Sequence, residues 1–567
     1  MRGVFTLEGS LGEDWLWNSY ISHSQTRFSV RTLGVAIKAN LKAAQDAVLV
    51  TPANRGTSGL PLGSIVCRSS LTGAAVTDGS LVNTVTASPG CVPLNIFGEG
   101  VASAAAVRYV TGNVPGNNQQ SFENMTLTMD VFEASMQGKL PWALPAGDIS
   151  TAFGFHYRKE AGKNVSSTIG DRAGYAVGNY VNFPSRNVNV REGFLEVDVP
   201  ILKDTFVQSL DFNAAGRMTD YSTSGLVETW KLGFTSQVIE DVKLRATWSV
   251  DIRAPTIQEL FGVSNNTGTF RDPRTPTAAT VTVVRQDRGN PTLSPETART
   301  ITGGIVLTPR WLPGFTFSAD WYDITLTGQI GLLDINNFYF PTCRIDTGNI
   351  SNPLCTVYDV VANGGGAFGQ ITRTNLNLNS TYTSGMDLQA NYVTEVWDND
   401  TLSLSFAATF MNEITRKDFG SSVADSYAGT LGGFNAQNST GRPKWNGTVS
   451  ANYKTGPYSF TTQVRWFGSA ILNNALNTGN RATAATRYQI SDDVFQVDPT
   501  AYLDLRASYD FNDNWQFYAA MDNALNIPPA MVPSNSDGTQ NNGGPIHSVE
   551  RYDYLGREVR LGVRVNF

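Results

Sequence analysis

Residues 242–253 alternate strictly between apolar and polar side chains, and this pattern limits the possible fold more than any other feature of the chain. The apolar positions are Val242, Leu244, Ala246, Trp248, Val250 and Ile252. The polar positions are Lys243, Arg245, Thr247, Ser249, Asp251 and Arg253. A period of two indicates a β-strand, and this one is longer than the usual strand of about five or six residues. Such a strand suits an outer-membrane barrel, in which about 9–11 tilted residues cross the bilayer with the apolar face toward lipid.

The same alternation recurs along the chain and predicts about 17 strands, with boundaries good to about two to four residues. The first strand is expected at Val4–Gly9, and the second begins at Trp15. The others are expected near 121–138, 149–158, 188–200, 207–221, 227–238, 241–253, 296–308, 315–329, 381–395, 401–415, 443–455, 457–472, 498–511, 515–528 and 553–567. We therefore expect an all-β fold, an antiparallel transmembrane β-barrel.

The connections between these strands alternate in length. Short turns are expected near 12, 143, 203, 240, 312, 398, 456 and 513, and only the short connection near 223 breaks the rule. Long connections are expected at 31–119, 162–187, 254–295, 330–380, 416–442, 473–497 and 529–552. Short turns at one end and long loops at the other are typical of bacterial outer-membrane barrels. Tryptophans gather beside the short turns and the long-loop ends, as expected for two interfacial belts.

Composition argues against several other classes of protein. The net charge of −7 does not suit a nucleic-acid-binding protein, which shows a concentrated basic face. No apolar run reaches the roughly 18 residues of a transmembrane helix. The three histidines, His23, His156 and His547, are isolated in sequence, and the carboxylates are scattered over alternating strand positions. We therefore expect no enzyme activity, no cofactor and no metal site, and we expect His156 to face the barrel lumen.

The four cysteines form two local pairs, each inside a polar segment without strand alternation. We expect two loop disulfides, Cys67–Cys91 and Cys343–Cys355, which require an oxidising compartment such as the periplasm or the cell surface. The alternative is four unpaired loop thiols.

Several motifs resemble those of a known family. Residues 249–261 read SVDIRAPTIQELF, in which a strand runs into Arg253, Ala254 and Pro255, followed by Glu259, Leu260 and Phe261. Together with NPTLSPETA (290–298), DNALN (522–526), the loop segment 65–100 and the terminal Phe567, they resemble the C-terminal barrel of TonB-dependent outer-membrane receptors. The resemblance covers essentially the whole chain. DNALN departs from it, with Ala and Leu where the family favours Leu and Phe.

The resemblance also implies parts that this sequence lacks. Receptors of this family carry a signal peptide, a short TonB-contacting box and a globular plug domain, and outer-membrane transporters have 22 strands. The N-terminus has no charged region followed by an apolar region. We therefore expect residues 1–567 to be a receptor barrel truncated at its N-terminus, without the plug and lacking roughly five strands. Such a barrel would be incomplete and open, with two sheet edges that lipid cannot satisfy.

The activity implied by the resemblance is active, TonB-dependent uptake of a scarce solute across the outer membrane of a Gram-negative bacterium. The solute would be a small molecule such as a siderophore–metal chelate or an oligosaccharide. The implied partners are outer-membrane lipid, the TonB complex through the missing N-terminal region, and the outer-membrane insertion machinery, which reads the terminal Phe567. No nucleic acid is expected as a partner.

Two groups of loop residues are candidates for solute contact. Arg271, Arg274, Arg285 and Arg288 could attract an anionic solute such as a metal chelate, although ordinary solvated loop charges explain them more simply. Tyr339 and Phe340, beside Cys343, could form a stacking platform, but loop aromatics more often contact neighbouring loops.

Two other classes of function stay open. A passive porin-like channel has about 16–18 strands, which matches the expected count, but the Arg-Ala-Pro motif and the long loops argue against it. A secreted β-rich structural or adhesion protein would stay in the aqueous phase, whereas a barrel needs detergent.

Overall fold

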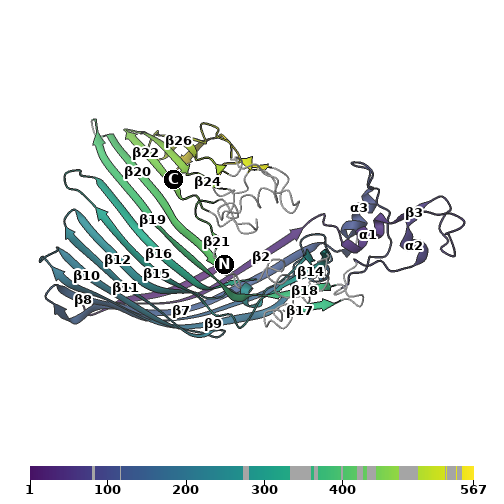
Figure 1. The fold of residues 1–567 in the computed structure, drawn as a ribbon, viewed down its shortest axis with the longest axis horizontal. Helices are drawn as coiled ribbons and strands as arrows, with labels where there is room; N and C mark the ends of the chain where they lie inside the picture. The colour runs from purple at the N-terminus through teal and green to yellow at the C-terminus, as the bar shows by residue number, and fades with distance from the viewer. Residues whose placement is uncertain are drawn as a thin grey trace.

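The computed structural model describes residues 1–78, 84–114, 117–271, 280–332, 359–362, 368–397, 400–417, 425–430, 442–471, 496–529, 531–532, 544–545 and 552–566. One sheet of 18 strands dominates this part of the chain (Figure 1). One of these strands is the two-residue β21 (Asp425–Ser426), which pairs with the end of β20. The other 17 form an antiparallel series in which each long strand pairs with the next. The predicted all-β antiparallel barrel of about 17 strands is confirmed.

The strands of this series run from ten to more than twenty residues in many cases, far beyond an ordinary globular strand. Their bounds are β1 (Arg2–Leu11), β2 (Trp15–Thr32), β7 (Ser121–Leu144), β8 (Gly147–Ser166), β9 (Phe183–Lys203), β10 (Ser209–Tyr221), β11 (Gly225–Ile239), β12 (Val242–Arg253), β15 (Glu296–Leu307), β16 (Phe315–Gly331), β19 (Leu376–Val396), β20 (Asp400–Lys417), β22 (Trp445–Thr455), β23 (Tyr458–Phe467), β26 (Thr500–Asp510), β27 (Trp515–Asp522) and β30 (Glu558–Val565).

The register places the apolar side chains of neighbouring strands on one common face. Trp230 of β11 lies opposite Val250 of β12, and Phe234 lies opposite Ala246. The same face continues through Ile301 of β15. We call this the outer face, and the face that carries the charged residues the inner face. Large apolar side chains on the outer face are exposed, which is the arrangement expected of a membrane barrel.

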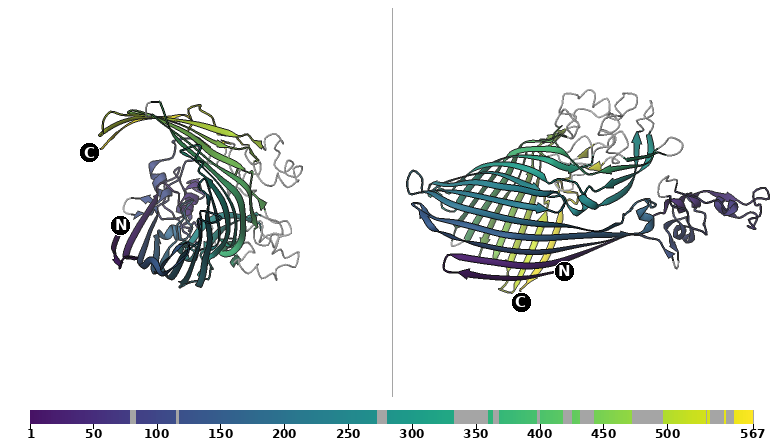
Figure 2. Two further views of the ribbon diagram at one scale, coloured as in Figure 1. Left: turned by 90° about the vertical axis from the view of Figure 1, so that its left-hand side faces the viewer. Right: turned by 90° about the horizontal axis from the view of Figure 1, so that it is seen from below.

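The sheet curls into a wall whose two edges lie apart (Figure 2). The first edge is β1, which pairs with β2, and the other edge is β30, which pairs with β27. Within the described residues no pairing joins β1 to β30. The open sheet agrees with the expected open barrel.

Aromatic side chains lie close over glycines of neighbouring strands at several places in the wall. A Cβ atom on Gly154 would lie 2.7 Å from the ring of Phe194, and one on Gly447 would lie 2.9 Å from the indole of Trp466. Tyr322 lies in the same way over Gly385, and Tyr518 over Gly562. Glycine leaves the room that each ring occupies, and the ring covers the strand that glycine would otherwise leave bare.

Gly385→Val is expected to destabilise the barrel by about 1–3 kcal/mol, because the new side chain would overlap the carbonyl oxygen of Phe410 and the hydroxyl of Tyr322. The control is Gly303→Val, since a Cβ atom at Gly303 meets nothing within 4 Å. The urea midpoint of the barrel in lipid vesicles measures both. Equal midpoints for the two variants would contradict the close contact at Gly385.

A separate module, which we call the arm, occupies residues 33–120 between β2 and β7 and projects beyond the sheet (Figure 2). Its elements are α1 (Lys38–Gln45), β3 (Ala47–Leu49), β4 (Ile65–Cys67), α2 (Arg68–Thr72), α3 (Ala104–Thr111), β5 (Asn113–Val114) and β6 (Asn117–Asn118). The predicted disulfide between Cys67 and Cys91 is confirmed, with a Cα–Cα distance of 6.2 Å. The other predicted disulfide, Cys343–Cys355, lies outside the described residues.

The arm is docked on the connection between β8 and β9, which contains α4 (Thr168–Asp171). Ile37 of the arm and Tyr175 of this connection are buried in one apolar cluster. The Lys38 ammonium donates a hydrogen bond of 2.9 Å to the carbonyl oxygen of Ala173. Burial lowers the pKa of Lys38, because a charged ammonium loses hydration there. Two successive long connections therefore form one body.

A four-stranded sheet lies at the end of the wall that is nearer to the arm (Figure 1). Its strands, in spatial order, are β13 (Val263–Arg271), β14 (Thr280–Arg288), β18 (Phe368–Thr374) and β17 (Asp359–Ala362). β14 and β18 come from different connections and pair in parallel. We call this the external sheet. The remaining short pairs are β24 (Ala470–Ile471) with β25 (Gln496–Val497), and β28 (Met531–Val532) with β29 (Gly544–Pro545).

Candidate functional site

The inner face changes from polar to apolar near the external sheet. On β9 the inward series runs through Glu192 and then reaches Val190 and Val188, which are both buried. On β10 the same step leads from Thr219 to Tyr221, opposite Val190. An apolar inner face needs a cover, because a water-filled lumen would leave it exposed.

The cover is the helix α5 (Ile257–Phe261), which follows β12. Leu260 is 1% exposed and belongs to one cluster with Val188, Val190 and Tyr221. A Cβ atom on Gly162 of β8 would lie 3.0 Å from Ile257, so the helix also contacts β8 closely. α5 therefore lies across the inner face of β8–β10.

A capping box starts α5. The Thr256 hydroxyl accepts a hydrogen bond of 3.2 Å from the Glu259 backbone N–H, and a Glu259 carboxylate oxygen accepts one of 2.8 Å from the Thr256 N–H. The two bonds satisfy N–H groups that the first turn of a helix leaves unpaired. Pro255, just before the cap, disfavours helical geometry in Ala254, so the helix starts no earlier.

Arg253, the last residue of β12, holds two carboxylates. Its guanidinium donates to Glu296, the first residue of β15, at 2.8 Å from Nε and 2.5 Å from Nη2. It also donates to Glu259 of α5, at 3.0 Å from Nη1 and 2.9 Å from Nη2. Glu296 is buried, and its Oε1 accepts a further bond of 2.8 Å from the Ile330 N–H of β16. We call this arrangement the Arg253 clamp; paired, two-point contacts of this kind are the strong form of an arginine–carboxylate interaction.

The clamp predicts a pH dependence. Burial would raise the pKa of Glu259, but hydrogen bonds from Arg253 and Thr256 and the charge of Arg253 outweigh it, so the pKa lies below its usual value. An unfolded Glu titrates near 4.3. Glu259 thus stabilises the docked α5 fully above about pH 4.3, and this stability is lost as the pH falls through the lower, folded-state pKa. Hydrogen exchange at the Leu260 amide, followed from pH 6 to about pH 3, measures the loss, and Glu259→Gln is expected to abolish the step.

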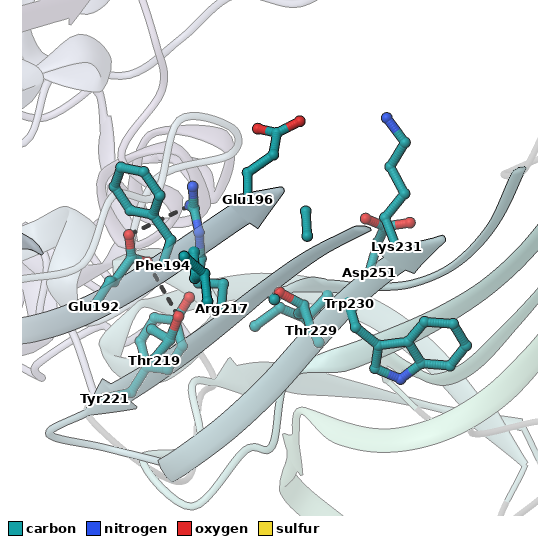
Figure 3. A pocket seen from close by; sticks show the side chains of 14 residues that line it. Glu192, Phe194, Glu196, Arg217, Thr219, Tyr221, Thr229, Trp230, Lys231 and Asp251 are labelled. Carbon is teal, nitrogen blue, oxygen red and sulfur yellow. Dashed lines mark hydrogen bonds and ion pairs between the residues drawn. The ribbon is translucent and has the colours of Figure 1, made fainter. Parts of the chain in front are cut away.

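Below α5 the inner wall holds a cavity of about 360 Å³ (Figure 3). Glu192, one of its lining residues, is buried and accepts hydrogen bonds from Thr219 at 3.4 Å and Arg217 at 3.5 Å. The Arg217 guanidinium also lies over the ring of Phe194, 5.4 Å from its centre. The remaining charged lining residues are Glu196, Lys231 and Asp251.

His156 lies on the inner face beside this cavity, as expected from the sequence. Its Nδ1 is 3.2 Å from a carboxylate oxygen of Glu192. Glu192 therefore contacts three polar side chains from two strands, β8 and β10. Such a network holds wall positions in place.

Of the four arginines predicted to contact solute, Arg285 and Arg288 have described side chains. Arg285 and Arg288 lie on opposite faces of β14, because their positions differ by three residues. Arg271 is the last residue of β13, whereas Arg274, Tyr339, Phe340 and the terminal Phe567 lie outside the described residues. The motif residues Arg253, Ala254, Pro255, Glu259, Leu260 and Phe261 do come together, around the clamp and α5.

Sequence reasoning missed two parts of this site. Glu296 belongs to the motif NPTLSPETA, but its pairing with Arg253 was not predicted, because this pairing follows from the strand register across 43 positions. Arg373 of β18 was also missed; it binds Asp287 of β14 at 2.6 and 2.9 Å. The Thr-x-x-Glu spacing of Thr256 and Glu259 was a readable signal for the helix start.

In the described part of the chain, no helix is long and apolar enough to cross a membrane. Over those same residues, no group of three or more His, Cys, Asp or Glu side chains could hold a metal ion.

The sequence model of the family described as "TonB dependent receptor-like, beta-barrel" matches residues 83–524. A mutant of the ferric enterobactin receptor PfeA from Pseudomonas aeruginosa, in complex with enterobactin, aligns at 13% identity and a TM-score of 0.52, covering 100% of this chain and 78% of the receptor. PfeA in complex with BCV-L6 aligns at 12% identity and a TM-score of 0.51, with coverages of 100% and 78%. At these identities the likeness concerns the fold alone. The search of curated protein sequences finds no match.

Proposed function

Because this chain belongs to the TonB-dependent receptor β-barrel family, we propose that it takes up a scarce solute across the outer membrane of a Gram-negative bacterium. The family consists of transport receptors rather than enzymes. We assign residues 1–567 to the barrel of the receptor, which works with the TonB complex. The observation that carries the proposal is the family match over residues 83–524.

The two faces of the wall support a place in the outer membrane. The exposed apolar outer face, with residues such as Phe234 and Trp248, suits contact with lipid. The inner face offers a polar passage lined by groups such as Glu192 and Arg217. We propose that the insertion machinery of the outer membrane recognises the C-terminal Phe567.

The charge of the external sheet favours an anionic solute. Asp287 of β14 is shared by Arg373 and Arg285, the latter with its Nε at 3.8 Å, so one carboxylate faces two guanidinium groups. Arg288 adds a further exposed positive charge. We therefore propose a siderophore–metal chelate as the first solute to test, and an oligosaccharide as the second. PfeA, a receptor of similar fold, binds enterobactin.

Uptake measurements test this proposal. A strain that lacks the gene is compared with the same strain carrying it, using radioactive iron bound to different siderophores and a set of labelled oligosaccharides. We expect one solute to accumulate only when the gene is present, and a protonophore to abolish the accumulation. Arg285→Gln and Arg373→Gln are expected to weaken uptake of an anionic chelate more than that of a neutral one.

Two results would favour other functions. A rate of solute uptake that is unchanged by the protonophore would indicate a passive porin-like channel. Partition of the protein into the aqueous phase of a detergent extraction would indicate a secreted structural or adhesion protein.

A further inference from the structure

The helix α5 is too short to be stable by itself. It has five residues, whereas isolated helices are marginal in water below about 12–15 residues. Its place on the inner wall therefore depends on its anchors. These are the buried Leu260, the cap formed by Thr256, and the Arg253 clamp. Glu259 is the single charged residue of α5, and Arg253 is its ion-pair partner.

We propose that Arg253 is a positioning residue for solute access: it holds α5 as a fixed lip over the inner wall, above the cavity at Glu192. This inference rests on the proposed uptake function. The lip and the cavity are continuous, because Tyr221 and Ile252 line the cavity and also contact the apolar cluster that holds α5. A solute that reaches the cavity from the external sheet therefore passes this lip.

The same clamp is joined to the external sheet. The Glu259 carbonyl oxygen accepts hydrogen bonds from the Asn290 backbone N–H at 2.9 Å and from the Asn375 side-chain amide at 3.2 Å. Asn290 in turn donates to the Asn375 carbonyl oxygen at 2.9 Å. Asn375 directly follows β18, and Asn290 lies two residues after β14. The external sheet and the lip are therefore attached to the wall at the same place.

The role of the clamp differs from that of a general stabilising pair. Loss of Arg253 leaves the 17-strand wall paired through its backbone, but it removes the ion-pair anchor of a helix that has no stability of its own. If the binding-competent arrangement falls to about a tenth of the molecules, the apparent affinity falls roughly tenfold, while molecules that do bind transport normally.

A spin label on α5 tests the position of the lip directly. Gln258 is exposed, and Gln258→Cys provides the attachment site in the full protein in lipid vesicles. We expect slow label motion in the otherwise unchanged protein, fast motion with Arg253→Gln, and intermediate motion with Arg253→Lys, which keeps the charge but not the two-point contact. The matched control is Arg310→Gln, which removes an arginine paired with Glu240 and Asp241 at the far end of the wall. The protein without Gln258→Cys gives the labelling background.

Uptake by the same variants tests the consequence. Arg253→Gln is expected to raise the half-saturating concentration roughly tenfold with the maximal rate unchanged, and Arg310→Gln is expected to change neither. If Arg253→Gln does not fold, Glu259→Gln replaces it, because that variant leaves the buried Glu296 paired. Unchanged label motion in the clamp variant, or an equal change in the Arg310 control, would overturn the proposal. If no solute is taken up by the unchanged protein, the proposed function fails, while the label comparison still decides the role of Arg253.

Discussion

Phe234→Arg is expected to destabilise the barrel in lipid by about 2–4 kcal/mol, the cost of an arginine near the middle of the lipid-facing band. Phe234 lies on the outer face of β11, its ring centre is 5.0 Å from that of Phe212, and it is 47% exposed. In a soluble sheet, an arginine at a half-exposed position would be tolerated, because water would solvate it. The size of the decrease in unfolding free energy therefore shows whether lipid or water covers this face. Urea unfolding in vesicles, with the heat-modifiable gel mobility of folded barrels as a second readout, measures it.

The neighbouring position provides the control. Thr235 follows Phe234 on the same strand but points to the inner face, opposite Asp211 and Arg245. Thr235→Arg is expected to change the unfolding free energy by less than about 0.5 kcal/mol, because it adds a charge to an already polar wall. A similar loss for both variants would show that the two faces are not in different surroundings.

Removing the disulfide of the arm, by Cys67→Ser together with Cys91→Ser, is expected to lower the local stability of the arm by about 3 kcal/mol. The bridge closes a loop with a sequence separation of 24 residues, and a loop of this length loses about that much conformational freedom in the unfolded state. The open fraction of the arm would rise roughly a hundredfold. Limited proteolysis within residues 47–100 measures this rise when opening and closing are fast relative to cleavage.

The barrel itself is expected to stay intact in this double variant. The disulfide lies in the arm, and the 17 strands of the wall pair without it. Unfolding of the wall at the same urea concentration as the unchanged protein is therefore the internal control. Cleavage of the arm at the unchanged rate would contradict a role for the disulfide in its stability.

The barrel could be predicted from the sequence because its physical rule is local. Each spanning strand must place apolar side chains on one face. The alternation from Val242 to Arg253 therefore predicts a strand without information about the neighbouring strands. The predicted first strand, Val4–Gly9, lies inside the observed β1 (Arg2–Leu11). Strand ends were less exact, because β7–β9 continue beyond the apolar band, where alternation no longer has to match lipid.

The candidate site could be predicted only in part. The motif residues from Arg253 to Phe261 were identified by resemblance, and the Thr256–Glu259 cap is readable from spacing. The partner Glu296 and the parallel pairing of β14 with β18 depend on contacts between distant segments, which no local pattern encodes. The change from the polar Glu192 to the apolar Val190 and Val188 can be read in the sequence. Its reason is the helix α5, which covers this part of the inner face.

The aromatic side chains that lie close over glycines have a consequence for the shape of the inner face. Phe194, Tyr322 and Tyr518 all lie on the inner face. An aromatic side chain that projected from this face would exchange between rotamers and occupy the space in front of the wall. Each ring instead lies close over the backbone of a glycine in the neighbouring strand, namely Gly154, Gly385 or Gly562. The space in front of these strands is then bounded by rings whose positions the underlying backbone fixes.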